Sequence, residues 1–253
     1  MNLLKPSPEA IEALVPTGTL RAAINLSNFL LVSRVDVNGT PYGVSPGMSM
    51  ALAEQLGAEL SLHTYKDPGD VADAATAGEW DIGNIGAEKA RAEVINFSAA
   101  YAEIESTYLV PEGSPIRSVE EVDQPGVVIA VKARAAYSLW LEENLHHAEL
   151  VLTDTVEASF DLFVERELQA LAGLRTQLLQ DALRLPGSCV LEGTFRSVQQ
   201  AIGTPKDRHP AGIEYLNAFV EAAKTDGLVR DLIEQYGVEG LSVAPPSPKH
   251  LIS

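Results

Sequence analysis

Short apolar segments and amphipathic helical segments alternate along this 253-residue chain, and they do so twice. In the first half, a strand pattern at residues 19–26 precedes helical periodicity at 48–56 and a second strand pattern at 58–65. In the second half, a buried-type strand at 127–131 precedes a helix at 133–145, and more strands and helices follow. Parallel strands need a long connection, which is usually a helix. The alternation therefore predicts an α/β protein with mostly parallel sheets and crossover helices.

The order of the segments also predicts how the chain divides. Two extended segments, residues 104–110 and 197–203, separate the second run of strands and helices from the first run and from the helices that follow. We expect both segments to cross between two lobes as a hinge. A proline-rich end is expected to remain outside the core. The predicted parts are a discontinuous lobe 1, an inserted lobe 2 and a tail, at residues 16–104 plus 198–240, 106–194, and 241–253.

Charge and composition exclude several classes of partner. The formal net charge is −17, which argues against nucleic acid and anionic membranes because both would repel the protein. No run approaches the roughly 20 apolar residues of a membrane helix, so we expect no membrane insertion. The chain has one cysteine, Cys189, and thus no intramolecular disulfide. We expect Cys189 to be buried at the start of a strand, and we expect a monomer without a cofactor or a metal site.

One stretch, residues 79–101, combines a strand, a glycine-bearing turn, an arginine and two closing aromatics. Gly83 and Gly86 are expected to form a turn, because glycine adopts positive φ and allows close approach of the backbone. Arg91 follows the turn, and its planar fork of donors suits a carboxylate. The alternative is a solvated arginine at the end of a helical turn.

This stretch resembles the signature of the family 3 solute-binding proteins, which have the type II periplasmic-binding-protein fold. Trp80-Asp81, Arg91, Phe97-Ser98 and Tyr101 stand at the spacings of that signature, and residues 18–23 match the family's opening Gly-Thr-Leu-Arg pattern. The resemblance extends loosely over residues 16–240. It implies two lobes that close over a small solute, and delivery of that solute to an ABC-transporter permease.

The resemblance implies a set of ligand-binding residues in lobe 1. Arg91 matches the arginine that clamps the ligand carboxylate, and Asn28 stands near the position of a stacking aromatic, with Phe29 next to it. The other members of the set belong to the predicted turn and are Gly83, Asn84 and Gly86.

In lobe 2, family members carry a Gly-Ser/Thr-Thr element whose amides and hydroxyls receive the carboxylate at a helix N-terminus. The corresponding residues here are 132–137, which lack those hydroxyls and place Arg134 in their stead, followed by Ala135. Tyr137 is either a stacking group or an ordinary helix-packing residue.

The largest departure from the family is at Leu174. Amino-acid binders typically carry an aspartate there, which pairs with the ligand ammonium, and here Arg175 follows the leucine. A site with Arg91, Arg134 and Arg175 as ligand-binding residues, and without that carboxylate, predicts an acidic or multiply anionic ligand. Alternatively, Glu103, Glu105 or Gln199 near the hinge receives an amine.

Two other functions remain open from the sequence. The same fold hosts lyases resembling cyclohexadienyl dehydratase, in which Glu103, Glu105 or Lys132 would act as acid or base. A regulatory sensor is the third possibility, although no DNA-binding segment accompanies it. The first nine residues lack the features of a secretory signal, so we expect a cytoplasmic protein, or a periplasmic one if a signal was removed.

Overall fold

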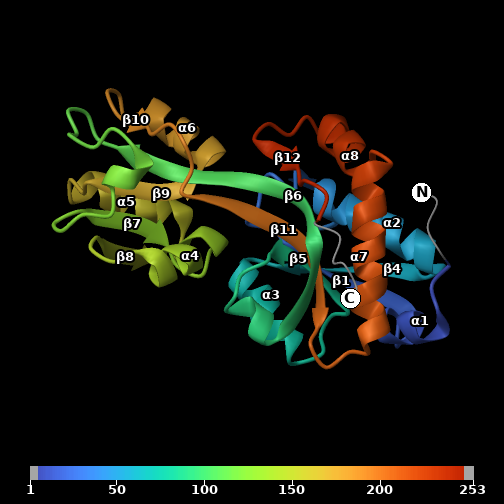
Figure 1. The fold of residues 1–253 in the computed structure, drawn as a ribbon. Helices are drawn as coiled ribbons and strands as arrows, with labels where there is room; N and C mark the ends of the chain where they lie inside the picture. Colours follow the sequence, from blue (N-terminus) through green and yellow to red (C-terminus); the bar gives the residue numbers. More distant parts are fainter. Residues whose placement is uncertain (1–4, 248–253) are drawn as a thin grey trace. The chain divides into compact units, whose positions relative to one another are not determined.

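The computed structural model describes residues 5–247 and has an α/β fold with a mixed sheet. The chain forms two compact units. Unit 2 spans Ile104–Val198, and unit 1 contains the described residues before and after it. The chain passes from one unit to the other twice, within β6 (Ile95–Val110) and within β11 (Arg196–Pro205) (Figure 1).

The sheet of unit 1 has the order β4-β1-β5-β11. The strands β4 (Glu59–Tyr65), β1 (Thr19–Asn25) and β5 (Ile82–Gly86) run parallel, as predicted, whereas β11 is antiparallel to β5. Side chains alternate between the two faces of a strand. Ile85 packs with Val71 and Trp80 on one face, and Trp80 Nε1 donates a hydrogen bond of 3.0 Å to Val71 O.

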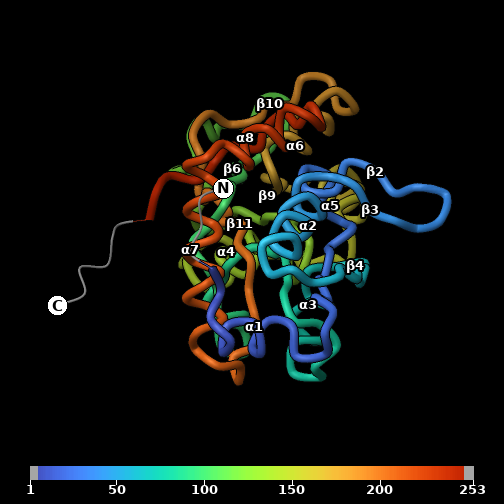
Figure 2. Tube along the Cα trace, turned by 90° about the vertical axis from the view of Figure 1, so that its right-hand side faces the viewer, coloured from blue at the N-terminus to red at the C-terminus, as the bar shows by residue number. Residues whose placement is uncertain are grey.

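Helices and short elements surround this sheet. The helix α3 (Pro68–Ala75) covers the Ile85 face, and α2 (Val44–Leu56) covers the other face, where its Ser49 bonds Asn84 of β5. Figure 2 shows the β2–β3 hairpin extending from unit 1. The remaining elements of unit 1 are α1 (Pro8–Leu14), β2 (Arg34–Val35), β3 (Pro41–Tyr42), η1 (Arg91–Glu93), α7 (Pro210–Thr225), α8 (Leu228–Tyr236) and β12 (Leu241–Val243).

Unit 2 repeats the same plan. The strands β9 (Ala170–Leu174), β7 (Val128–Lys132) and β8 (Glu149–Thr153) are parallel, and the second part of β6 pairs antiparallel with β9. Phe160, Phe163 and Leu178 form the centre of an apolar cluster with the sheet. The remaining elements are η2 (Val119–Glu121), α4 (Ala136–Asn144), α5 (Val156–Glu165), α6 (Arg175–Arg184) and β10 (Cys189–Val190).

Several predicted boundaries are wrong. The helix α2 begins at Val44 instead of residue 48, because Pro46 lies in the first turn, where a missing N–H costs nothing. The strand β6 begins at Ile95, so the extended segment predicted at residues 104–110 is only the second part of a strand of 16 residues. The helix α6 was not predicted. Cys189 does begin a strand, but it is exposed because β10 lies at the edge of the sheet beside β6.

The predicted tail is partly folded into unit 1. Leu241–Val243 forms β12, which pairs with β6, and Ala244 N donates to Tyr101 O at 3.1 Å. Lys224 Nζ also donates to Pro245 O at 2.9 Å. Proline lacks only the N–H, so its carbonyl still accepts hydrogen bonds. The rest of the tail, residues 248–253, lies outside the described residues. Within the described part of the chain, no helix is long and apolar enough to cross a membrane.

Candidate functional site

The carboxyl ends of β1 and β5 lie side by side in unit 1. The two strands are parallel, and Ile24 is paired with Asn84. The loop after Asn25 and the loop after Gly86 therefore leave the sheet at the same edge. In open α/β sheets, this edge is where ligands bind.

Arg91 lies in the second of these loops and is only 4% exposed. Its Nη1 donates to Gly86 O at 2.8 Å. The turn that carries it is closed by hydrogen bonds from Ala92 N to Glu88 O and Lys89 O, at 2.9 and 3.1 Å. The alternative of a solvated arginine is contradicted by this burial. A buried guanidinium at this edge is suited to a carboxylate, with which it forms strong charge-assisted hydrogen bonds.

The side chain of Asn84 is hydrogen-bonded to α2. It is 1% exposed, and its Nδ2 donates to Ser49 Oγ at 3.0 Å. Ser49 Oγ in turn donates to Ser45 O at 3.0 Å. Since the serine proton is directed to Ser45 O, Ser49 Oγ acts as the acceptor for Asn84. This chain of hydrogen bonds sets which end of the carboxamide faces α2.

Neither glycine of the predicted turn has a positive φ, and both belong to β5. The expectation of a turn at this point is therefore wrong. Gly83 has a packing explanation instead, because an added Cβ would lie 3.2 Å from Trp80 Cη2 and 3.3 Å from Val71 Cγ1. These contacts are closer than most side-chain contacts in proteins, so Gly83 allows α3 to pack on the strand. Gly86, the last residue of β5, provides the carbonyl that receives Arg91.

Two asparagine side chains accept hydrogen bonds within the loop after β1. Asn25 Oδ1 accepts from Ser27 N and Ser27 Oγ, at 3.1 and 2.8 Å. Asn28 Oδ1 accepts from Leu30 N at 3.2 Å. Phe29 is 44% exposed. Of the two ligand-binding residues predicted here, Phe29 offers a ring for stacking, whereas the Asn28 carbonyl group supports the turn.

In unit 2, the predicted residues surround the start of α4. Arg134 is exposed and has a φ of 60°, a left-handed conformation that is unfavourable for a residue with a Cβ. Ala135 is the N-cap of α4 and makes no side-chain capping bond. Tyr137 and Lys132 are buried, and Lys132 Nζ donates to Ala133 O at 3.4 Å. The binding roles of Arg134, Ala135 and Tyr137 stay predictions.

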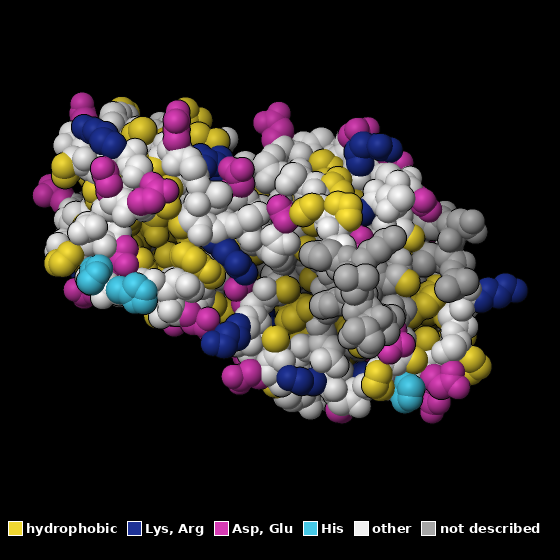
Figure 3. Space-filling model, in the orientation of Figure 1, with side chains coloured by type: hydrophobic (Ala, Val, Ile, Leu, Met, Phe, Trp, Pro, Cys, Tyr) yellow, Lys and Arg dark blue, Asp and Glu magenta, His cyan; other side chains and the backbone are white. Residues whose placement is uncertain are grey.

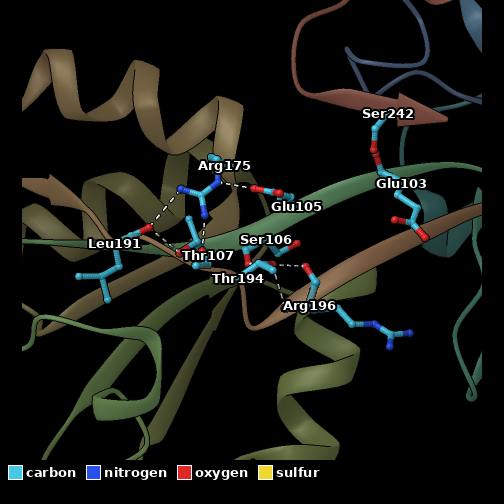
Figure 4. Close-up of polar contacts among 10 residues, drawn as sticks. Glu103, Glu105, Ser106, Thr107, Arg175, Leu191, Thr194, Arg196 and Ser242 are labelled. Carbon is cyan, nitrogen blue, oxygen red and sulfur yellow. Dashed lines mark hydrogen bonds and ion pairs between the residues drawn. The ribbon is translucent and has the colours of Figure 1, made fainter. Parts of the chain in front are cut away.

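Arg175 has a structural explanation (Figure 4). Its Nε donates to Glu105 Oε2 at 2.6 Å and its Nη1 to Leu191 O at 3.1 Å, while Nη2 donates to Gly193 O. The arginine thereby fastens the start of α6 to β6 and to the segment after β10. A ligand would compete with these contacts for Arg175 and Glu105, so their binding roles are predictions without geometric support.

Gln199 and Glu103 lie together in unit 1. Gln199 Nε2 donates to Glu103 Oε1 at 2.8 Å, and Gln199 O accepts from Ala87 N at 2.8 Å. Gln199 thus connects β11 to the loop that carries Arg91. Glu103 O also accepts from Ser242 Oγ of β12 at 3.4 Å (Figure 4).

Asp81, which belongs to the Trp80-Asp81 motif, has a structural role. The residue is fully buried. Its carboxylate accepts hydrogen bonds from Arg21 N, Nε and Nη2 and from Arg208 Nη2, at distances from 2.7 to 3.1 Å. The hydrogen bonds with Asp81 raise the pKa of Arg21. The presence of Arg21 in the opening motif and Asp81 in the second motif was the available signal for this pair.

Comparisons with known proteins agree with this architecture. The model of the family described as bacterial extracellular solute-binding proteins, family 3, matches residues 20–239. No curated protein matches the chain. Among solved structures, a solute receptor for L-cysteine from Neisseria gonorrhoeae has a TM-score of 0.72 and 19% identity, over 92% of this chain and 99% of that chain. The amino-acid transporter protein AbpA from Streptococcus pneumoniae, bound to L-arginine, has a TM-score of 0.68 and 18% identity, over 90% and 99% of the two chains.

A third similar structure is an ancestral amino-acid-binding protein described as a precursor of cyclohexadienyl dehydratase. Its TM-score is 0.70 at 20% identity, over 90% of this chain and 99% of that one. At such identities, the likenesses establish the fold and leave the ligand of this chain open.

Proposed function

The chain belongs to the family 3 bacterial extracellular solute-binding proteins, and from this membership we propose that it binds a small metabolite bearing a carboxylate. The ligand is amino-acid-like or an organic acid. The similar proteins that bind arginine and cysteine support this class of ligand.

The observation that carries the proposal is the burial of Arg91. Its guanidinium is 4% exposed and is positioned by Gly86 O at the carboxyl edge of the sheet. The planar fork of donors of a guanidinium matches a carboxylate in a bidentate geometry. The neighbouring strand β5 and loop after β1 then provide the remaining contacts to the ligand.

We further propose that units 1 and 2 act as lobes that close over this ligand, with the two chain crossings in β6 and β11 as the hinge. A ligand favours a closed state only through contacts that the open state lacks. Residues Arg134, Ala135 and Tyr137 would supply those contacts from unit 2. Delivery to an ABC-transporter permease would require the periplasmic alternative, which cell fractionation distinguishes from the cytoplasmic one.

The test uses Arg91→Ala, with Arg230→Ala as a control at an exposed arginine that pairs with Asp231. A panel of L-amino acids and small carboxylic acids is titrated, and the ligand-induced rise in Tm is measured. We expect Arg91→Ala to weaken binding about 10- to 100-fold through loss of a charged hydrogen-bonding group, without unfolding the protein. The control should bind as the wild type does. A normal ligand-induced shift in Arg91→Ala contradicts the assignment.

The second candidate function is a lyase on the same fold, which the likeness to the precursor of cyclohexadienyl dehydratase supports through the fold. Its proposed carboxylates already have partners in this structure, since Glu103 bonds Gln199 and Glu105 bonds Arg175. Product analysis after incubation with the same panel separates the two functions. Turnover supports the lyase, and saturable binding of an unchanged ligand supports the solute-binding protein.

A further inference from the structure

Two carboxamide oxygens are buried in unit 1 without a hydrogen-bond donor among the described residues. They are Oδ1 of Asn84 and Oε1 of Gln200, and the two residues are 1% and 3% exposed. A buried acceptor without a donor is costly, because the group loses its water and gains nothing in return. Such atoms in a folded protein therefore call for an explanation.

The two residues are neighbours on one face of the sheet. In the antiparallel pairing of β11 with β5, Ile202 lies opposite Asn84, and Gln200 lies opposite Gly86. Opposite residues share a face, and so do residues two apart along a strand. Gln200 is thus the diagonal neighbour of Asn84. Gly86, which lies opposite Gln200 and two residues from Asn84, has no side chain on this face.

The orientation of Asn84 is fixed by α2. Its Nδ2 is bound to Ser49 Oγ, so the unpaired end of the carboxamide is the oxygen. Arg91 reaches the same place, because its Nη1 is bonded to Gly86 O, in the residue opposite Gln200. A guanidinium suited to an anion and two oxygens that can accept hydrogen bonds are therefore grouped around the carboxyl end of β5.

We propose that Asn84 Oδ1 and Gln200 Oε1 form a subsite that receives an N–H group of the ligand whose carboxylate Arg91 holds. This inference rests on the proposed function and narrows the class of ligand to a carboxylate that also bears a nitrogen donor. Two acceptor oxygens repel a second carboxylate, which disfavours the multiply anionic ligand expected from the sequence. The subsite supplies amine recognition in a chain that has Leu174 where amino-acid binders carry an aspartate.

The first measurement compares matched pairs of probes on the wild type. Each L-amino acid is titrated beside the carboxylic acid that lacks its amino group, and dissociation constants are measured by calorimetry. We expect the nitrogen-bearing member to bind at least about tenfold more tightly, as befits hydrogen bonds to a charged donor. Equal binding of both members contradicts the subsite and leaves the proposed function standing. If neither the amino acids nor the carboxylic acids bind, that result contradicts both the proposed function and the subsite.

Two variants test the residues themselves. Gln200→Met replaces the carboxamide by an apolar group of similar length, and it should weaken binding of the amino acids at least about tenfold while leaving their deaminated partners unchanged. Its Tm without ligand should not fall, because the substitution removes a buried acceptor that has no donor. Gln235→Met, at an exposed position of α8, is the matched control. Asn84→Asp should increase the preference for the amino acid over its deaminated partner.

Equal weakening of both members of a pair by Gln200→Met would overturn the assignment of Gln200. A lower Tm of unliganded Gln200→Met would also overturn it, because the carboxamide would then serve the fold. An unchanged or reduced amine preference in Asn84→Asp would remove Asn84 from the subsite.

Discussion

Buried polar side chains in this protein fall into two kinds when they are taken residue by residue. Asp81 represents the first kind, since Arg21 and Arg208 surround its carboxylate and account for its burial within the fold. Asn84 and Gln200 represent the second kind, since each keeps a buried oxygen for which the described residues supply no donor. Asn84 and Gln200 lie near the end of β5 whose last residue, Gly86, accepts the hydrogen bond of Arg91, so a ligand held by Arg91 could supply their donor. Other buried atoms of the second kind, such as Ser106 Oγ and Asp181 Oδ2, lie in unit 2.

The backbone conformation of Arg134 leads to a prediction about the stability of the protein. It and Glu167 are the non-glycine residues with positive φ in the described part of the chain. Because a Cβ is unfavourable in this conformation, Arg134→Gly should stabilise the free protein by about 1 kcal/mol. Chemical denaturation measures this change, and Glu167→Gly is the control for the backbone effect alone. If Arg134 receives the ligand, Arg134→Gly also weakens binding, whereas Glu167→Gly does not.

A loss of stability in Arg134→Gly would mean that the arginine side chain supports the fold. Unchanged ligand affinity in that variant would exclude Arg134 from the site.

Helices and strands that are marked by a short-range pattern in the sequence were predicted well. The strand predicted at residues 58–65 is β4 (Glu59–Tyr65), and the strand predicted at 127–131 is β7 (Val128–Lys132). Elements that depend on distant partners were predicted poorly. The strand β6 is long because it pairs with β9, β10, β11 and β12, which follow it at a distance in the sequence. The helix α6 exposes Leu179 and Leu183, which obscures its amphipathic pattern.

The helix α6 carries a pH-sensitive group. Asp181 is buried there, and burial raises the pKa of its carboxyl, although hydrogen bonds from Gln177 and Arg184 oppose the shift. A raised pKa in the folded state means that ionisation of Asp181 disfavours folding. Stability from this group is therefore lost as the pH rises through the folded pKa, and regained as the pH falls toward the unfolded pKa of about 3.9.

Asp181→Asn should remove this contribution. We expect the variant to lose less stability than the wild type as the pH rises from about 4 toward neutral, because ionisation of the buried wild-type carboxylate disfavours folding. Urea denaturation over this range measures the free energy of unfolding. Asp161→Asn, on the neighbouring helix α5, is the control for removal of a negative charge. Parallel stability profiles for the wild type and Asp181→Asn would show that Asp181 does not titrate in this way.

For the whole molecule, the sequence was sufficient for the α/β class and for the choice of Arg91 as a candidate, but only for part of the candidate site. Arg91 stands in a motif of short range, so its spacing could be read directly. Gln200 was missed because only the register of β11 on β5 places it beside Asn84, and that register joins distant parts of the chain. The acidic surface is not informative about the site, since Asp and Glu side chains are scattered over the visible face of each unit (Figure 3).

The central claim is that Arg91 holds the carboxylate of a small ligand. Mass spectrometry of the small molecules that co-purify with the wild type and with Arg91→Ala, after denaturation of equal amounts of protein, tests it most directly. We expect a molecule with a carboxylate and a nitrogen donor that is present with the wild type and lost from the variant. A bound molecule without a carboxylate, or one retained equally by both proteins, would contradict the claim.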